Sequence, residues 1–245
     1  MLNKITKINE LKNIVSKLRP FSPGELERLK EEFAVEYTFD SNAIEGSPLT
    51  LEETSLVLKE NITIAEKPLN FHLSAIGHLD AYYYIEELIK ENIELSEKEI
   101  LNIHSLVLMD FPSDKGKYRS IPVKILNTET LVTQPYLIKP KMEELIKWYN
   151  ESNLETISKI ALFHLKFETI HPFIDGNGRT GRLILNFELM KSGYVPINIK
   201  YKDRRKYYDA FKIYNEKEDY SLMTDLISDY LIEELNRYIS LRVQV

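Results

Sequence analysis

The chain of 245 residues contains no cysteine and only 8 glycines. The lack of cysteine excludes disulfides, thiolate metal sites and a cysteine nucleophile, and it fits a reducing compartment. An excess of positive charge is also missing, because the formal net charge is −6 at pH 7. Proteins that bind a phosphate backbone without sequence preference usually carry a basic patch or stripe. We therefore expect no nucleic-acid partner.

Long hydrophobic runs are absent as well. No segment approaches the roughly 20 apolar residues that span a bilayer, and no apolar core of a signal peptide follows Met1. We expect a cytoplasmic protein that does not insert into a membrane. With 43% hydrophobic residues, the chain can bury one large core or two modest ones.

Apolar residues recur at three- and four-residue spacing through most of the chain, which predicts an all-α fold. One apolar stripe predicts a helix over residues 22–44, and Gly46 is expected to stop it. Thr50 with Glu53 forms the pattern of a capping box at the start of the next helix. Further helices are predicted at residues 50–59, 70–91, 96–110, 140–150, 154–169, 178–191, 203–216 and 221–241.

One segment departs from the helical pattern. Between Gly116 and Pro135, aliphatic residues flank the turn-forming residues 127–130, which predicts a short β-hairpin. A lone hairpin is marginally stable, so this one is a candidate flap that becomes ordered by covering a ligand. A surface excursion without a function is the alternative.

The loop at residues 171–182 combines residue types suited to binding a polyphosphate. Gly176 and Gly178 let the backbone approach a ligand and point N–H groups at it, close to the positive end of the following helix. Arg179 and Arg182 are three residues apart, so both can offer forked donors to phosphate oxygens from one side of the helix. This pattern predicts an anion-binding site.

Two further side chains in the loop add reactivity. Asp175 offers the hard carboxylate oxygen that Mg²⁺ prefers, and His171 can accept a proton near neutral pH. Taken singly, each residue is more often structural than catalytic, and a plain helix connection is the alternative. Together they supply the parts that in-line phosphoryl or nucleotidyl transfer requires.

The remaining histidines show no spacing typical of a zinc site. They are His72, His78, His104 and His164. His164 lies about two helical turns before His171, and we expect it to support the site by hydrogen bonding.

The segment His171-Pro-Phe-Ile-Asp-Gly-Asn-Gly-Arg-Thr-Gly-Arg182 resembles the signature of the Fic family, His-Pro-Phe-x-Asp/Glu-Gly-Asn-Gly-Arg-x-x-Arg, without a gap. The resemblance extends from about residue 36 to 230, through Gly116-x-Tyr118-Arg119 before the loop and a Tyr207-Tyr208 pair after it. It implies a Fic-type helical bundle with a small β-hairpin flap, in an enzyme that transfers AMP from ATP to a Ser, Thr or Tyr hydroxyl of a target protein.

The resemblance also assigns roles within the loop. His171 would remove the proton from the target hydroxyl, and Asp175 would hold Mg²⁺ between the α- and β-phosphates. The remaining residues implied to bind the nucleotide in this loop are Gly176, Asn177, Gly178, Arg179, Thr180, Gly181 and Arg182.

Outside the loop, the resemblance implies a docking strand and an adenine pocket. The flap would lay Val123, Lys124, Ile125 and Leu126 against the target backbone as an added strand. Tyr207 and Asn215 would border the adenine, although Tyr207 and its neighbour Tyr208 could equally be core aromatics.

The segment Ser41-Asn-Ala-Ile-Glu45-Gly46 resembles the inhibitory motif of the family, Ser/Thr-x-x-x-Glu-Gly/Asn. Ser41 and Glu45 share a helix face, and Gly46 ends the helix so that the carboxylate can reach Arg182. Such an ion pair would occupy the guanidinium that should hold the γ-phosphate, so ATP would bind only unproductively. The alternative is an ordinary solvated glutamate at a helix end.

These features predict two parts, an N-terminal helical extension with the inhibitory motif (residues 1–60) and a Fic catalytic domain with C-terminal helices (residues 61–245). We expect a protein adenylyltransferase that uses ATP and Mg²⁺, is autoinhibited by Glu45 and modifies a target protein or itself, with a homodimer as a hypothesis. The alternatives are removal of AMP by the same site, transfer of phosphocholine or phosphate, and a non-catalytic Fic-fold interaction module.

Overall fold

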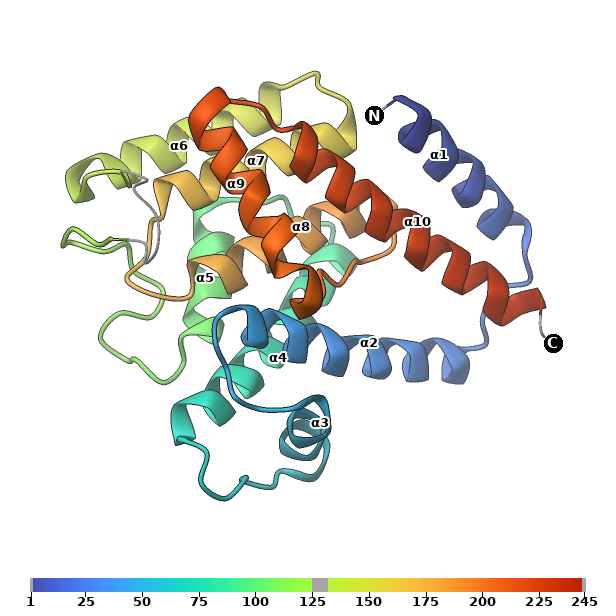
Figure 1. Cartoon of the computed structure of the whole chain (residues 1–245), viewed down its shortest axis with the longest axis horizontal. Coiled ribbons are helices and arrows are strands. Elements are labelled where there is room, and N and C mark those ends of the chain that lie inside the picture. The colour runs from blue at the N-terminus through green and yellow to red at the C-terminus, as the bar shows by residue number, and fades with distance from the viewer. Residues whose placement is uncertain (1, 125–131, 244–245) are drawn as a thin grey trace.

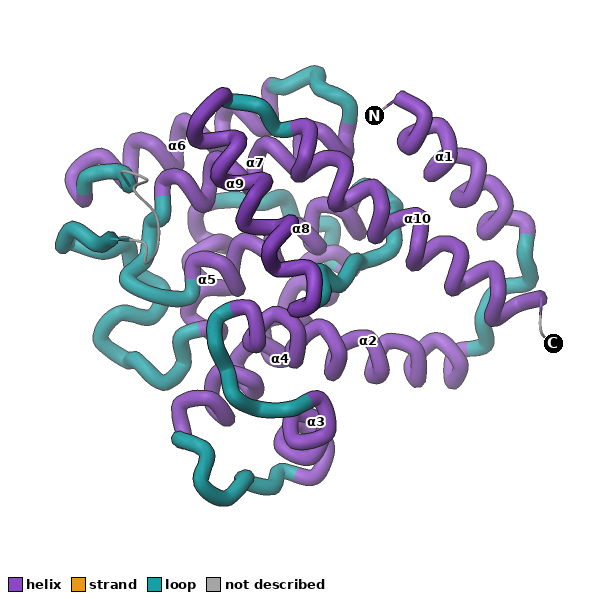
Figure 2. The backbone as a smooth tube through the Cα atoms, viewed as in Figure 1, coloured by secondary structure: helices purple, strands orange, loops and turns teal. Residues whose placement is uncertain are grey.

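The computed structural model describes residues 2–124 and 132–243, which form helices joined by turns and loops, with no β-strand among them (Figures 1 and 2). The prediction of an all-α fold is confirmed. The elements in chain order are α1 (Leu2–Lys17), α2 (Pro23–Ile44), α3 (Leu51–Glu60), α4 (Leu69–Lys90), α5 (Glu97–Val107), α6 (Pro135–Glu151), α7 (Thr156–Ile170), α8 (Asn177–Lys191), the 3₁₀-helix η1 (Tyr201–Asp203), α9 (Arg204–Lys217) and α10 (Ser221–Val243).

The predicted β-hairpin falls between α5 and α6. Its described parts, residues 116–124 and 132–134, form turns and loops. Ile125, Leu126 and the expected turn at residues 127–130 lie outside the described residues. The hairpin therefore stays a prediction.

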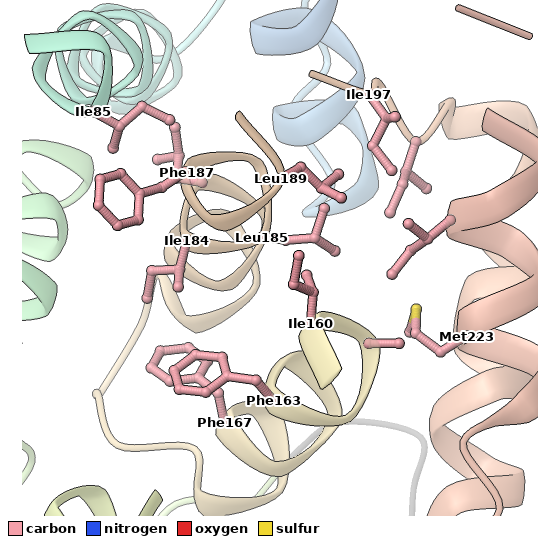
Figure 3. Packing of buried hydrophobic residues seen from close by; sticks show 14 of the residues in the cluster. Ile85, Ile160, Phe163, Phe167, Ile184, Leu185, Phe187, Leu189, Ile197 and Met223 are labelled. Atoms are coloured by element: carbon pink, nitrogen blue, oxygen red, sulfur yellow. The ribbon is translucent and has the colours of Figure 1, made fainter. Parts of the chain in front are cut away.

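Helix α8 lies at the centre of the bundle, where it packs against α4, α5 and α7. Residues 179–189 are all buried, which is typical of a helix surrounded by others rather than lying on a surface. Figure 3 shows its apolar side chains packed among those of α7, with side chains of α4 and α10 beside them. The residues labelled there, from all of these elements and the segment after α8, are Ile85, Ile160, Phe163, Phe167, Ile184, Leu185, Phe187, Leu189, Ile197 and Met223. This packing holds the start of α8, and with it the predicted anion-binding loop, in a fixed place.

The ends of α2 follow local sequence signals. The Ser22 backbone donates to the Glu25 carboxylate (2.7 Å) and the Glu25 backbone donates to the Ser22 hydroxyl (3.3 Å), which satisfies two N–H groups at the start of the helix. At the other end Gly46 has a positive φ of 91°, a conformation that glycine adopts without strain. The predicted helix over residues 22–44 and its stop at Gly46 are confirmed.

The body of α2 is anchored by Asp40, which is buried. Its two carboxylate oxygens accept hydrogen bonds from the Asn198 side chain (2.7 Å) and from the backbone N–H of Tyr201 (2.8 Å). The Lys200 ammonium lies 3.7 Å from the same carboxylate. The segment before α9 thus fixes α2 one turn before its C-terminal end.

Two helices depart from the sequence prediction. Helix α1 was not predicted, and it buries Ile8 and Leu11 against α10, so its apolar face has meaning only beside that distant partner. Helix α6 begins at Pro135 rather than at residue 140. Pro135 occupies the first helical position, where a missing N–H costs nothing, and Pro140 is accommodated within the helix.

The predicted division into residues 1–60 and 61–245 stays a prediction, although α1 and α2 both pack on helices of the larger part. Among the described residues, none of the helices is long and apolar enough to cross a bilayer.

Gly77 allows α4 to pack closely against α5, because a Cβ atom at this position would overlap the carbonyl oxygen of Leu106. We expect Gly77→Ala to lower the free energy of unfolding by about 1–3 kcal/mol through overpacking, measured by urea unfolding. The matched control is Gly24→Ala in α2, where an added Cβ meets nothing within 4 Å. The control should leave stability unchanged or raise it by about 0.4–1 kcal/mol. Equal stability of Gly77→Ala and the wild type would contradict the close packing.

Candidate active site

The loop between α7 and α8 is shaped by its own side chains. His171 ends α7 in a left-handed conformation (φ 51°, ψ 62°), and Gly176 precedes α8 with φ 76°. Asn177 is buried and closes the loop by accepting from the backbone N–H of Phe173 (2.9 Å) and donating to its carbonyl (2.9 Å). Both polar atoms of Asn177 therefore hold the loop itself.

Asp175 is the most accessible acidic group of the loop, with its side chain 60% exposed. One carboxylate oxygen accepts from the Gly176 N–H (2.6 Å) and lies 3.4 Å from the Arg179 guanidinium. The Arg179 side chain is otherwise buried and donates to the Ser74 hydroxyl of α4 (2.7 Å). Asp175 and Arg179 are thus brought together at the accessible face of the loop.

His104 of α5, which the sequence did not single out, supports this face from below. Its Nε2 lies 3.0 Å from the Asp175 carbonyl, and its Nδ1 accepts from the Gly116 N–H (3.0 Å). This pattern assigns the proton to Nε2 and makes the ring neutral. Burial lowers the pKa of His104 to about 4, so the ring stays neutral at physiological pH.

The His171 imidazole is largely enclosed. Burial, followed by the positive charge of Arg119, lowers the pKa of His171 to about 4. Its Nδ1 lies 4.0 Å from the carboxyl group of Glu168. Burial, together with the nearby Glu45 carboxylate, raises the pKa of Glu168 to about 8. At neutral pH His171 is therefore an uncharged ring that can accept a proton.

Arg182 is only 2% exposed and meets the predicted inhibitory residues. Its guanidinium donates to the Ser41 hydroxyl (3.0 Å), to the Ser41 carbonyl (2.8 Å) and to the Glu45 carboxylate (2.8 Å). The Glu45 side chain is 38% exposed, so this ion pair lies at the edge of the core. The structure thus brings together Ser41, Glu45 and Arg182 as the sequence predicted.

The Glu45 carboxylate also lies directly against Gly178, because a Cβ atom at that position would overlap its Oε1. Gly178 is in the first turn of α8, where backbone N–H groups and the helix dipole favour an anion. Glu45 therefore occupies the place in which a bound anion would be expected.

The Tyr207-Tyr208 pair divides between the core and the surface. Tyr207 is buried, and its hydroxyl lies 2.7 Å from His164 Nε2 and 3.4 Å from the Arg182 guanidinium. The expectation that His164 forms a supporting hydrogen bond is confirmed. Tyr208 is 48% exposed and donates to the carbonyl of Ile44 (2.9 Å), at the end of α2.

The other predicted residues lie at different depths. Thr180 is buried, and Gly181 faces α7, because a Cβ atom there would overlap the Glu168 carboxyl group. Asn215 accepts from the Thr169 hydroxyl (3.1 Å) at the surface. Within the flap segment, Val123 is half-buried and Lys124 is exposed, and Ile125 and Leu126 lie outside the described residues.

Known proteins share this fold. This chain superposes on the crystal structure of a Fic-domain-containing signaling protein from Bacteroides thetaiotaomicron, with a TM-score of 0.87 and 26% identity over 95% of each chain. It also superposes on Fic-1 from C. elegans with a TM-score of 0.88 and 28% identity, over 97% of this chain and 71% of that one. The helical arrangement is therefore a Fic fold.

The sequence comparisons agree with the fold. Residues 94–189 match the Fic/DOC family, so the chain contains a Fic domain. It is 34% identical over 199 residues to proteins named protein adenylyltransferase Fic from Drosophila yakuba and Drosophila melanogaster. The match covers 80% of this chain and 40% of each relative, so the chain spans well under two thirds of their length.

Proposed function

We propose that this chain transfers AMP from ATP to a Ser, Thr or Tyr hydroxyl of a target protein and that Glu45 inhibits the transfer. The observation that carries the proposal is the Glu45 carboxylate, which pairs with Arg182 (2.8 Å) over Gly178 at the start of α8. The name of the Drosophila relatives, protein adenylyltransferase, supports the choice of reaction.

His171 is the proposed base. Burial holds the pKa of its ring at about 4, so the ring is neutral when it meets a target hydroxyl. It takes the hydroxyl proton while the oxygen forms a bond to the α-phosphorus of ATP. The bond between the α-phosphorus and the bridging oxygen breaks, and pyrophosphate leaves. This balance requires no covalent intermediate on the chain.

Asp175 is the proposed ligand of Mg²⁺, and its accessible carboxylate fits that role. Mg²⁺ commonly binds through one or two carboxylates together with substrate phosphates and water. The described residues contain no cluster of three His, Asp or Glu side chains that could form a metal site without a substrate. When bound, the ion would neutralise phosphate charge beside Arg179.

The start of α8 is the proposed phosphate cradle. Its N–H group at Gly178, together with Arg179 and Arg182, would face the phosphates, whereas the Gly176 N–H already donates to Asp175. Glu45 opposes this binding in two ways, because it occupies the Arg182 guanidinium and places a negative charge over Gly178. A nucleotide would then bind with its phosphates displaced from the productive position.

The outer parts of the site are proposed from the resemblance and from accessibility. Asn215 lies at the surface of α9, where it could border the adenine, whereas Tyr207 lies beneath Arg182 and would act on the nucleotide only through that arginine. Residues 123–126 are the proposed docking strand for the target.

Replacement of Gly178 tests whether the Glu45 carboxylate occupies the space that the phosphates would need. Gly178→Ala should expel the Glu45 carboxylate, because the new Cβ atom would overlap it. The same atom would also obstruct a phosphate, so Glu45→Gly/Gly178→Ala should label protein at least about tenfold more slowly than Glu45→Gly, a difference of about 1.4 kcal/mol in the activation free energy. Equal rates of the two variants would show that the phosphates bind elsewhere.

The experiment that tests the proposed function uses ATP radiolabelled at the α-phosphate, with Mg²⁺. Wild type, Glu45→Gly and Glu45→Gly/His171→Ala are incubated alone and with a cell lysate. Label on protein that appears with Glu45→Gly and disappears without His171 would support both the reaction and the inhibition. Nucleotide binding without label in any sample would overturn the proposal.

A further inference from the structure

Arg119 is a buried cation in the segment that follows α5, only 5% exposed. Each nitrogen of its guanidinium donates to a backbone carbonyl of a different part of the chain. Nε donates to His171 (2.8 Å), Nη1 to Ile121 (3.0 Å) and Nη2 to Thr133. One planar group therefore joins the residue proposed as base to Ile121 and to Thr133, in the two described parts of the segment between α5 and α6.

The backbone of Arg119 adds a fourth bond to the same place. Its N–H donates to the carbonyl of Pro172 (3.0 Å). Two consecutive carbonyls of the loop between α7 and α8, those of His171 and Pro172, thus accept hydrogen bonds from a single residue. The orientation of the peptide unit between them is fixed from outside the loop.

This orientation matters because His171 has a left-handed backbone, with φ 51° and ψ 62°. A side chain with a Cβ atom loses on the order of 1 kcal/mol or more in this conformation, which persists only where the surroundings impose it. The backbone angles set the direction of the Cα–Cβ bond, and so the position of the imidazole. Arg119 donates a hydrogen bond to the carbonyl of His171 itself.

We propose that Arg119 is a positioning residue for His171. Its guanidinium holds the left-handed backbone that orients the imidazole, and it ties that backbone to the carbonyls of Ile121 and Thr133. The proposal rests on the proposed function, in which His171 is the base. None of these four hydrogen bonds reaches the start of α8, so Arg119 acts on the reaction through His171 and not through the phosphates.

Lysine is the informative replacement, because it keeps the charge but cannot make the three forked bonds. Glutamine removes the charge and retains one amide donor group. Both variants are made in the Glu45→Gly background, and thermal unfolding establishes that each is folded. If Arg119→Gln does not fold, Arg119→Lys carries the test alone.

The first measurement is independent of activity. A crystal structure of each folded variant should show His171 outside the left-handed region, with a negative φ. Retention of the left-handed His171 backbone in the folded variants would overturn the proposal, whatever the protein transfers. Because this result needs no substrate, it separates failure of the proposal from failure of the proposed function.

The second measurement compares kcat for AMP transfer with the Kd for Mg-ATP from calorimetry. A displacement of about 1 Å can cost on the order of 10²-fold in rate, so kcat should fall by about that factor while Kd changes less than about twofold. A kcat within about threefold of the Glu45→Gly parent would overturn the proposal. So would a loss of nucleotide binding that matches the loss of kcat, because Arg119 would then act on the phosphate cradle.

Discussion

Replacement of Glu45 by glycine should raise the rate of AMP transfer about tenfold to a hundredfold. The change frees the Arg182 guanidinium and removes the negative charge over Gly178. That factor corresponds to about 1.4–2.7 kcal/mol, which is close to the roughly 1.5–3 kcal/mol that a hydrogen bond to a charged group contributes. The measurement is the initial rate of protein labelling at saturating Mg-ATP.

Glu45→Gln is the matched variant for this prediction. The amide keeps the size of the side chain but removes its charge, so it still lies over Gly178 and should raise the rate by less than glycine does. Equal labelling by wild type and Glu45→Gly, with nucleotide bound in both, would contradict the inhibitory role. Equal activation by glycine and glutamine would assign inhibition to charge alone.

Replacement of His171 by alanine in the Glu45→Gly background should lower the rate by about 10²–10⁴-fold, the contribution typical of a positioned base. Nucleotide affinity should be retained, because the His171 ring lies outside the first turn of α8. The measurements are the labelling rate and the Kd for Mg-ATP by calorimetry. Labelling that persists at the parent rate would exclude His171 as the base.

The pH profile of Glu45→Gly offers a further check on the base. Burial and the charge of Arg119 lower the pKa of His171, and Glu45 and Asp175 act in the opposite direction. Above its pKa of about 4 in the wild type, the ring is neutral and one of its nitrogens can accept a proton, so it is competent as a base. Loss of the Glu45 charge should move that pKa further down, so the rate should not decline through protonation of this ring between pH 7 and 5.

Local chemistry explains which parts of the fold could be predicted from the sequence. The limits of α2 follow from a capping box at one end and a glycine at the other, and both signals act within a few residues. The start of α3 at Leu51 follows in the same way from Thr50. Helix α1 could not be predicted so readily, because its two buried apolar residues are explained by α10 at the far end of the chain.

The same distinction applies to the candidate site. The meeting of Ser41, Glu45 and Arg182 was expected from two motifs that carry their own geometry. Ser74 and His104 were not singled out as site residues, because each reaches the loop from a distant part of the sequence and no spacing marks it. Arg119 was noted only as part of the pattern Gly116-x-Tyr118-Arg119 and was given no role, although it also reaches the loop. Tyr207 was expected either beside the adenine or in the core; its side chain is buried beneath Arg182, and its role at the adenine stays a prediction.

The anchoring of α2 through Asp40 bears on how fast the proposed inhibition by Glu45 would be relieved. Because Asn198 and Tyr201 hold the helix one turn before its end, Glu45 can leave Arg182 by rotation of its own side chain while the helix stays in place. Rotamer changes of exposed side chains take picoseconds to nanoseconds, whereas collective helix and domain movements take microseconds to milliseconds. The inhibited and open arrangements would then exchange many times within one catalytic turnover. Wild-type protein should therefore label its target at a low rate that is constant from the start of the reaction, without a lag.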